Sequence, residues 1–166
     1  MRTKAFAGNI GFVGAGALGS TMARAMHQAG YSVTAVTSRT TASAEQMMME
    51  LDGCNAMQTA QEVADCSDVV LLTVPDNAIE IVANATQWRP GQVVVHCSGA
   101  TPLSMLNPAK NVGALIGAIH PLQTFGATDE APVVMQGIAY AIESEPPLSE
   151  GLANLATDLG GWPIAL

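Results

Sequence analysis

The sequence predicts an α/β fold in which helices cover both faces of a doubly wound, mostly parallel sheet. Short apolar runs alternate with helical patterns along the chain, most of these runs are apolar throughout, and a glycine-rich turn follows the first of them. Strands that are apolar on both sides belong in sheets buried on both faces, and helices between successive strands favour parallel pairing.

The composition fits one globular domain. Of the 166 residues, 49% are hydrophobic and only 12% are charged, the opposite of a disordered chain. The net charge of −8 and the scattered basic residues argue against nucleic acid and anionic membranes as partners. No run reaches the roughly 18 apolar residues of a membrane span. The three cysteines form no CxxC pair, which indicates reduced thiols in a cytoplasmic protein and no metal site.

The first fifty residues predict two strands and two helices. Residues 9–14 form an apolar run that reads as a buried strand, and residues 31–37 form the second. Residues 17–30 place apolar side chains on one helical face, and Gly30 supplies the stop. Residues 41–51 are rich in Ala, Met and Glu, as in a helix.

The middle of the chain continues the alternation. Residues 55–57 predict a short strand, and residues 59–66 a short helix whose Thr59 and Glu62 have the spacing of a capping box. Residues 69–74 form a fully apolar strand. The remaining predicted elements are helices at 77–85 and 148–159 and strands at 92–97, 115–119, 137–142 and 163–166. The loop 126–132 is the best candidate for local disorder.

A GxGxxG pattern lies where the first strand passes into the first helix. Its residues are Gly14, Ala15, Gly16, Ala17, Leu18 and Gly19. In this context Gly14 permits the tight turn, Gly16 admits a pyrophosphate close to the backbone, and Gly19 lets helix and strand pack closely. The pyrophosphate then binds the helix N-terminus. The alternative is a glycine-rich turn that binds nothing.

The end of the second strand favours NADP over NAD. An NAD site carries an acidic residue about 20 residues after the motif, whereas this chain has Ser38, Arg39 and Thr40. Arg39 can pair with a 2′-phosphate, and the two hydroxyls can donate hydrogen bonds. The alternative is a surface arginine at a strand end.

The fourth strand ends at Val74, Pro75 and Asp76, which we expect beside the nicotinamide ribose. Asp76 is equally compatible with a plain helix N-cap.

Two polar clusters follow the next strands, where parallel strands bring their carboxyl ends to one edge. Ser98 and Gly99 come directly after His96 and Cys97, and His120 precedes Gln123 and Thr124. A histidine near neutral pKa suits proton transfer to a carbonyl oxygen, so His120 is the candidate acid/base. Ser98, Gln123 and Thr124 are candidate substrate contacts. His96 also fits a core position, and Cys97 fits an apolar filler.

The segments GFVGAGALGS, TSRT, LLTVPDNAI, VVVHCSGA and IHPLQTF together resemble a bacterial family in which an N-terminal Rossmann-like domain precedes a C-terminal helical domain. Its members are described as NADP-dependent oxidoreductases by similarity to deazaflavin-dependent NADP oxidoreductases and pyrroline-5-carboxylate reductases. The resemblance implies that residues 1–166 form the NADP-binding Rossmann-like domain and that the helical domain, which closes the cleft and mediates dimerisation, is absent from this chain.

A looser likeness to prephenate dehydrogenases implies that His120 is the acid/base and that Ser98 contacts the substrate. His120 and Ser98 are therefore the candidate catalytic residues, and Gly99 is a further candidate substrate contact. The leading hypothesis is therefore an NADP-dependent oxidoreductase acting on a small polar substrate. One alternative is a non-catalytic module that senses a dinucleotide. Another is a nucleotide-binding subunit that associates through an exposed apolar face. The apolar ending at 163–166 predicts a homodimer or a larger species.

Overall fold

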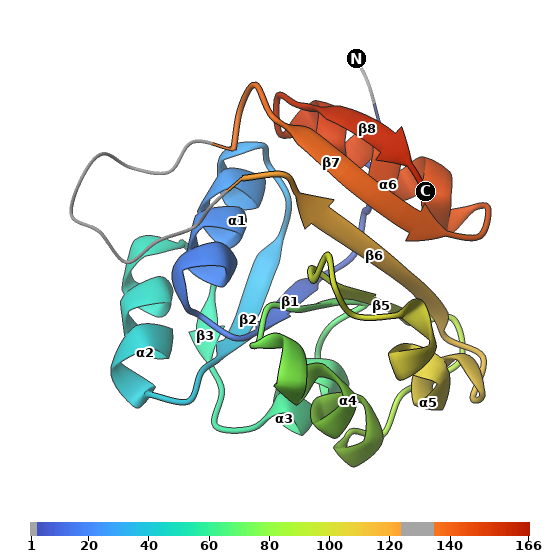
Figure 1. Cartoon of the computed structure of the whole chain (residues 1–166). Coiled ribbons are helices and arrows are strands. Elements are labelled where there is room, and N and C mark those ends of the chain that lie inside the picture. The colour runs from blue at the N-terminus through green and yellow to red at the C-terminus, as the bar shows by residue number, and fades with distance from the viewer. Residues whose placement is uncertain (1–2, 124–134) are drawn as a thin grey trace.

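In the computed structural model, which describes residues 3–123 and 135–166, eight strands form one sheet in the order β3-β2-β1-β4-β5-β6-β7-β8 (Figure 1). Neighbouring strands are parallel except β6 and β7, which confirms the predicted mostly parallel α/β fold. The strands are β1 (Ile10–Val13), β2 (Val33–Thr37), β3 (Asn55–Ala56), β4 (Val69–Leu72), β5 (Val93–His96), β6 (Leu115–Pro121), β7 (Ala139–Ser144) and β8 (Trp162–Ala165).

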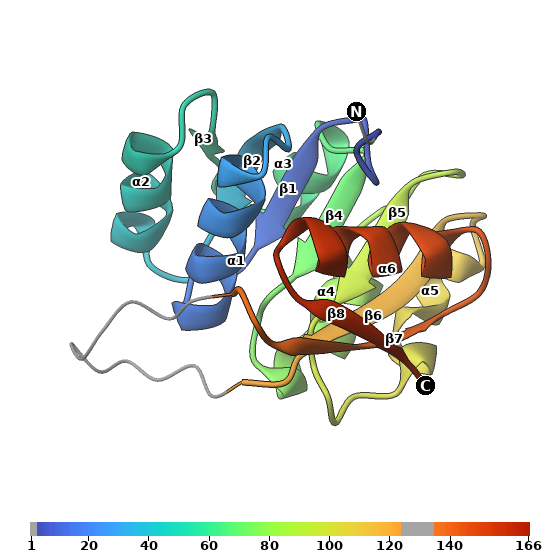
Figure 2. The same ribbon diagram turned by 90° about the horizontal axis from the view of Figure 1, so that it is seen from above.

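Helices cover both faces of the sheet, as predicted. One hydrophobic core lies beneath α1, α2 and α6, and the other lies beneath α3, α4, η1 and α5 (Figure 2). The helices are α1 (Ala17–Gln28), α2 (Thr41–Glu50), α3 (Ala60–Asp65), α4 (Asp76–Ala85), the 3₁₀ helix η1 (Leu103–Leu106), α5 (Asn107–Lys110) and α6 (Leu148–Asp158).

Two features were not specified by the sequence-based prediction. The stretch between β5 and β6 contains η1 and α5, whose apolar repeats are too short to stand out in the sequence. In addition, β7 pairs antiparallel with β6, an orientation that the prediction of a mostly parallel sheet left open. The loop predicted at 126–132 lies outside the described residues.

The strand order places a crevice at one end of the sheet. Strand β1 pairs with β2 on one side and with β4 on the other. The chain therefore adds β2 and β3 on one side of β1 and then crosses to the other side, where β4 begins the second half of the sheet. In doubly wound sheets, ligands bind outside the carboxyl ends of the strands at this point. Each helix within residues 3–123 and 135–166 is too short or too polar for a membrane crossing.

Candidate functional site

A cavity of about 620 Å³ lies at the carboxyl ends of β1, β2 and β4. Most of its wall consists of apolar side chains and glycine backbone, an arrangement that suits a nucleotide better than a small ion. Nine of the residues predicted to hold the cofactor line it: Gly14, Ala15, Gly16, Ala17, Leu18, Ser38, Arg39, Val74 and Pro75.

The three glycines of the motif occupy three different environments. Gly14 has a φ of +112°, and a Cβ there would lie 2.5 Å from the carbonyl oxygen of Thr73. A Cβ on Gly19 would overlap the carbonyl oxygen of Gly14. At Gly16, by contrast, a Cβ would meet no atom within 4 Å and the backbone is extended. Gly14 and Gly19 are therefore required by the fold, whereas Gly16 keeps space open beside the cavity.

Thr73 fixes the glycine loop to the adjoining strand. Its hydroxyl donates to the carbonyl oxygen of Gly14 at 2.7 Å, and the Gly14 N–H donates to the carbonyl oxygen of Thr37 at 2.9 Å. Both threonines line the cavity and are absent from the sequence-based set. The available signal was that Thr73 is the one hydroxyl residue in the apolar run VVLLTV.

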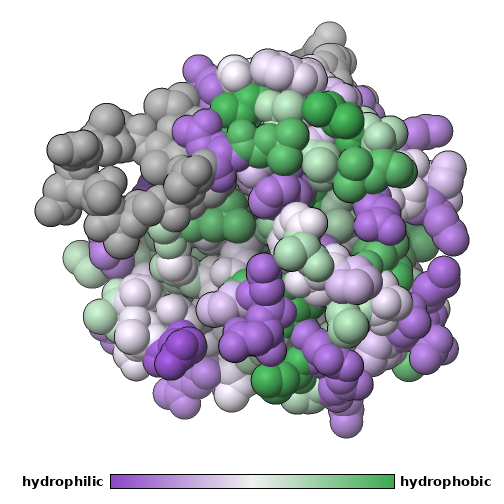
Figure 3. Space-filling model, viewed as in Figure 1, coloured by the Kyte–Doolittle hydropathy of each residue, from purple (hydrophilic) through white to green (hydrophobic). Residues whose placement is uncertain are grey.

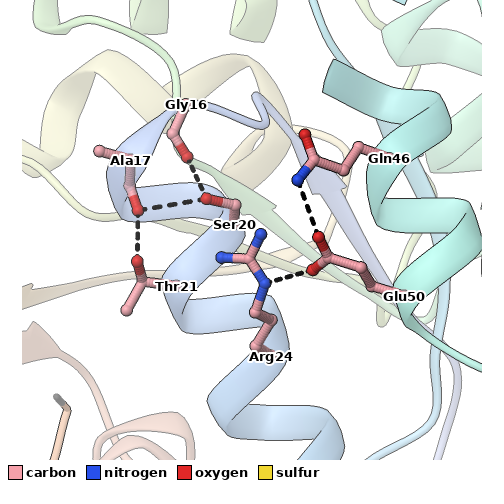
Figure 4. A network of polar contacts seen from close by, with 7 residues as sticks. All are labelled: Gly16, Ala17, Ser20, Thr21, Arg24, Gln46 and Glu50. Atoms are coloured by element: carbon pink, nitrogen blue, oxygen red, sulfur yellow. Dashed lines mark hydrogen bonds and ion pairs between the residues drawn. The ribbon is translucent and has the colours of Figure 1, made fainter. Parts of the chain in front are cut away.

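The start of α1 presents backbone donors to the cavity. Its N-cap residue, Gly16, has no side chain to bond them, and the first turn carries no acidic residue. The Ser20 hydroxyl donates to the Gly16 carbonyl oxygen at 2.7 Å, which fixes the turn without using the N–H groups (Figure 4). Free N–H groups and the helix dipole favour an anion at this position.

Arg39 lines the cavity with an exposed side chain and no ion pair or side-chain hydrogen bond in the described part of the chain. The other described cations are engaged elsewhere: Lys4 with Ala29, Arg24 with Glu50, Arg89 with Ala64 and Ser67, and Lys110 with Glu145. Figure 4 shows that Arg24 reaches from α1 to α2. Arg39 is thus the described cation available to an anionic ligand.

The remaining wall of the cavity comes from short apolar side chains that sequence reasoning missed. Ala78 and Val82 lie four residues apart on α4, and Ala60 begins α3. Their spacing on one helical face was visible in the sequence, but it is indistinguishable from ordinary core packing. Together with Val13 they give the cavity an apolar lining, which suits the base of a nucleotide.

Three predicted cofactor residues do not line the cavity. Gly19 packs beneath the loop, and Thr40 precedes α2 with its hydroxyl 2.7 Å from that of Ser43. Asp76 is the first residue of α4 and is exposed. The N-cap of that helix is Pro75, and no side chain caps it.

His120 lies at the carboxyl end of β6, beside the turn that follows β5. Its Nδ1 is 3.1 Å from the carbonyl oxygen of Cys97, which only accepts, so the neutral ring carries its proton on Nδ1 and leaves Nε2 as a base. A Cβ on Gly99 would lie 2.8 Å from that Nε2. The structure therefore brings the His120 ring against the Ser98–Gly99 turn.

His96 is completely buried at the end of β5. Its Nδ1 accepts the Ser98 N–H at 3.2 Å, which places the ring proton on Nε2, and Nε2 has no partner among the described residues. Burial lowers the pKa of His96, the Asp76 carboxylate opposes this shift, and the charge of His120 adds to it. His96 is thus a neutral core histidine that orients the turn carrying Ser98.

The other candidate residues near His120 differ in their hydrogen bonds and in their burial. The Ser98 hydroxyl oxygen accepts the N–H groups of Ala100 and Thr101 at 3.2 and 3.1 Å, so its own proton is available to a ligand oxygen. Gln123 is exposed directly after β6, and Thr124 lies outside the described residues. Cys97 is buried, and burial raises the pKa of its thiol to about 12, which excludes a thiolate nucleophile.

No metal site emerges from the described residues, in which no three His, Cys, Asp or Glu side chains gather. The three cysteines are free thiols.

Comparison with known proteins identifies the fold family. The family model for a Rossmann-like domain matches residues 3–121, whereas no curated protein matches the chain. A protein from Bacteroides fragilis described as a candidate NADP oxidoreductase superposes with a TM-score of 0.80 at 21% identity, over 95% of this chain and 59% of that one.

Two further solved structures carry bound ligands. A reductive aminase from Aspergillus terreus in complex with NADPH and ethyl levulinate gives a TM-score of 0.75 at 19% identity, over 97% of this chain and 55% of that one. A 3-hydroxyisobutyrate dehydrogenase from Mycobacterium tuberculosis with L-serine gives 0.78 at 16%, over 96% and 54%. The present chain therefore spans a little over half the length of these proteins, and the likeness establishes the fold.

Proposed function

Because this chain belongs to the Rossmann-like domain family, we propose that residues 1–166 form the NADP-binding domain of an oxidoreductase that acts on a small molecule. The observation that carries the proposal is the pairing of an open cradle at Gly16 with the unpaired Arg39 in one cavity. The cradle suits the pyrophosphate, and the guanidinium suits the 2′-phosphate. The solved structures that bind NADPH support the same cofactor.

The residues present fit NADP at each of its parts. The start of α1 would hold the pyrophosphate, Arg39 and Ser38 would hold the 2′-phosphate, with Thr40 next to them in the chain, and Ala78 and Val82 would contact the adenine. Strand β4 pairs with β5, so Val74 and Pro75 lie on the side of the cavity toward Ser98, where the nicotinamide would bind. When bound, NADPH supplies a hydride for reduction of a carbonyl or imine carbon.

His120 is the general acid/base in this proposal. Its Nε2 accepts the proton of an alcohol or amine during oxidation and, once protonated, donates it during reduction. The hydrogen bond from Nδ1 to the Cys97 carbonyl oxygen holds the ring in one orientation, beside Gly99, and leaves the lone pair of Nε2 to accept a proton. Ser98 donates its free hydroxyl proton to the substrate oxygen, and Gly99 and Gln123 are further candidate contacts. This base at the rim favours an oxidoreductase over a purely dinucleotide-sensing module.

The homodimer expected from the apolar ending remains part of the proposal. The N–H groups of Trp162 and Leu166 point toward β7, so by alternation those of positions 163 and 165 face the free edge. Pro163 has no N–H, which weakens that edge for strand pairing. An interface through β8 would therefore use its side chains and not its backbone.

Calorimetric titration of NADP⁺ and NAD⁺ tests the proposal. NADP⁺ should bind more tightly, and Arg39→Ala should weaken it by about 1.5–3 kcal/mol while leaving NAD⁺ binding unchanged. Lys110→Ala removes the same charge from a residue paired with Glu145 and should leave both affinities unchanged. Equal binding of the two cofactors by the unaltered chain would refute the assignment of NADP.

A further inference from the structure

The surface beside His120 is apolar, and strand register defines its members. His120 pairs with Ala141 across β6 and β7, and Ala141 pairs with Ile164 of β8. Directly opposed residues of neighbouring strands point to the same face of a sheet, so these three side chains form one row. Ala139 and Trp162 form the adjoining row. Leu122 lies beside this row, because its N–H donates to the Ala139 carbonyl oxygen.

We call Leu122, Ala141, Trp162 and Ile164 the apolar wall. Leu122, Trp162 and Ile164 are 49%, 52% and 41% exposed. Helix α6 packs against Tyr140 and Ile142, on the other face of the same strands, so it does not cover the wall. Figure 3, in the orientation of Figure 1, shows hydrophobic surface gathered over β7 and β8.

The wall lies within reach of a molecule held at His120. Adjacent strands are about 4.8 Å apart, so Ile164 lies about two strand spacings, roughly 10 Å, from His120 along the row. A ligand whose carbonyl or imine contacts His120 can therefore extend its body along this row, past the buried Ala141 and toward Ile164, where the exposed apolar surface lies. Because the wall lies in the same row of the sheet as His120, a molecule bound at His120 is its natural occupant, which would not hold for apolar residues scattered over the surface.

Charge further restricts the occupant. Lys110 pairs with Glu145 near the amino end of β6, the end opposite His120. Arg24 lies on α1, Arg39 lines the cofactor cavity, and the remaining described cations, Lys4 and Arg89, bond carbonyl oxygens elsewhere. Residues 124–134 add two acidic residues and no Lys or Arg to the sequence. A substrate carboxylate would therefore lose its hydration at the wall without gaining a cationic partner among the described residues.

From this geometry we infer that the wall binds the apolar body of the second substrate, an uncharged or cationic ketone or imine, and that Ile164 and Trp162 select against carboxylate-bearing substrates. The inference rests on the proposed function, because it places the reacting group at His120. It narrows the small polar substrate expected from the sequence to a compound whose body, away from the reacting group, carries no carboxylate.

A matched pair of probes tests the inference. Ethyl levulinate and levulinate share one ketone and differ by the charge of a carboxylate. Both are titrated into the chain saturated with NADP⁺, which cannot reduce them, so binding is measured without turnover. Acrylamide quenching reports the wall directly, because Trp162 is half exposed and Trp88, the other tryptophan, is buried.

Ethyl levulinate should protect Trp162 from quenching, and levulinate should bind at least about tenfold more weakly. Ile164→Lys should reverse this preference by supplying a cation. Met49→Lys adds the same charge to the exposed face of α2, beyond the opposite edge of the sheet, and should leave the preference unchanged.

Retained NADP⁺ binding shows that each variant is folded, and it separates this test from that of the proposed function. Three results would overturn the inference while NADP⁺ still binds: levulinate binding as tightly as the ester, binding of neither probe, or Trp162 already shielded from quenching in a dimer of the ligand-free chain. The last result would assign the wall to a second copy.

Discussion

The carboxyl ends of β1, β2 and β4 enclose a cavity of about 620 Å³, whereas the ends of β5 and β6 place His120 beside an open apolar wall. In the first region, backbone donors and one cation converge on a partly enclosed cavity. In the second, a single base and one hydroxyl lie at the edge of an exposed surface. The contrast indicates that the fold alone builds a cofactor cavity, whereas the surface beside His120, where we propose that the substrate binds, is more open.

The largest effect should follow removal of the base in the open region. His120→Asn should lower turnover by about 10²–10⁴ and leave NADP affinity unchanged, because a positioned acid/base contributes about that much. The measurement is NADPH oxidation with a ketone or imine found to bind the wall, together with the melting temperature. Unchanged turnover with a lower melting temperature would make His120 a structural residue of the turn and would remove the chemistry from this region.

The next effect separates ligand space from packing space within the enclosed region. Gly16→Val should weaken binding of both NADP⁺ and NAD⁺ by about 10- to 100-fold, since overpacking costs about 1–3 kcal/mol, and its melting temperature should stay near that of the unaltered chain. Gly19→Val is the matched control.

In the control, the added side chain meets the carbonyl oxygen of Gly14 and the hydroxyl of Thr73, so Gly19→Val should lower the melting temperature itself. If Gly16→Val binds both cofactors normally, the motif is only a turn.

These expectations also show where sequence reasoning succeeds. The predicted roles of Gly14 and Gly19 agree with the geometry because a tight turn and a close helix–strand contact depend on neighbouring residues. Thr59 and Glu62 form the predicted capping box for the same reason. Strand interiors were also predictable, since four consecutive apolar residues in β4 leave few alternatives to a sheet buried on both faces.

The residues that sequence reasoning missed depend on long-range register. Thr73 reaches the glycine loop only because β4 pairs with β1, 59 residues away along the chain. The apolar wall exists only because β7 reverses direction and β8 then pairs parallel with it. No local pattern marks Ile164 as a neighbour of His120, so this surface could not be derived from the sequence.

The buried histidine of the open region predicts an effect of pH on stability. Since the folded pKa of His96 lies below the ordinary 6.5, its contribution to stability is complete above pH 6.5 and is lost as the pH falls from there toward the folded pKa. Over that range the unfolded state binds more of the proton than the folded state, so the unfolding free energy should fall with pH by at most about 1.4 kcal/mol per pH unit.

Denaturant titrations between pH 7 and pH 5 measure this slope. It should diminish in His96→Asn and persist in His27→Asn, the same substitution at a half-buried position on α1. A slope unaffected by His96→Asn would mean that the buried ring does not govern acid sensitivity.

The smallest effect belongs to the ion pair that joins α1 to α2 beside the enclosed region. The Arg24 side chain donates to Glu50, which lowers the pKa of that carboxyl, partial burial opposes the shift, and Gln46 adds a second hydrogen bond at 2.8 Å. The side chains of Arg24 and Glu50 are 38% and 34% exposed, so water screens their attraction.

Glu50→Gln should therefore destabilise the fold by less than about 1 kcal/mol at pH 7, and 1 M salt should reduce the difference further. A lowered folded pKa means that this contribution is complete above the ordinary value of 4.5 and disappears as the pH falls below it. Acid unfolding of the two proteins should thus converge below pH 4.5, well under the range assigned to His96. Glu80→Gln, on an exposed α4 position, should show no such difference. A tenfold loss of NADP⁺ affinity in Glu50→Gln would give a different result. It would mean that the Arg24–Glu50 ion pair positions α2 and the turn that carries Arg39, and that the cavity is less rigid than its glycine loop implies.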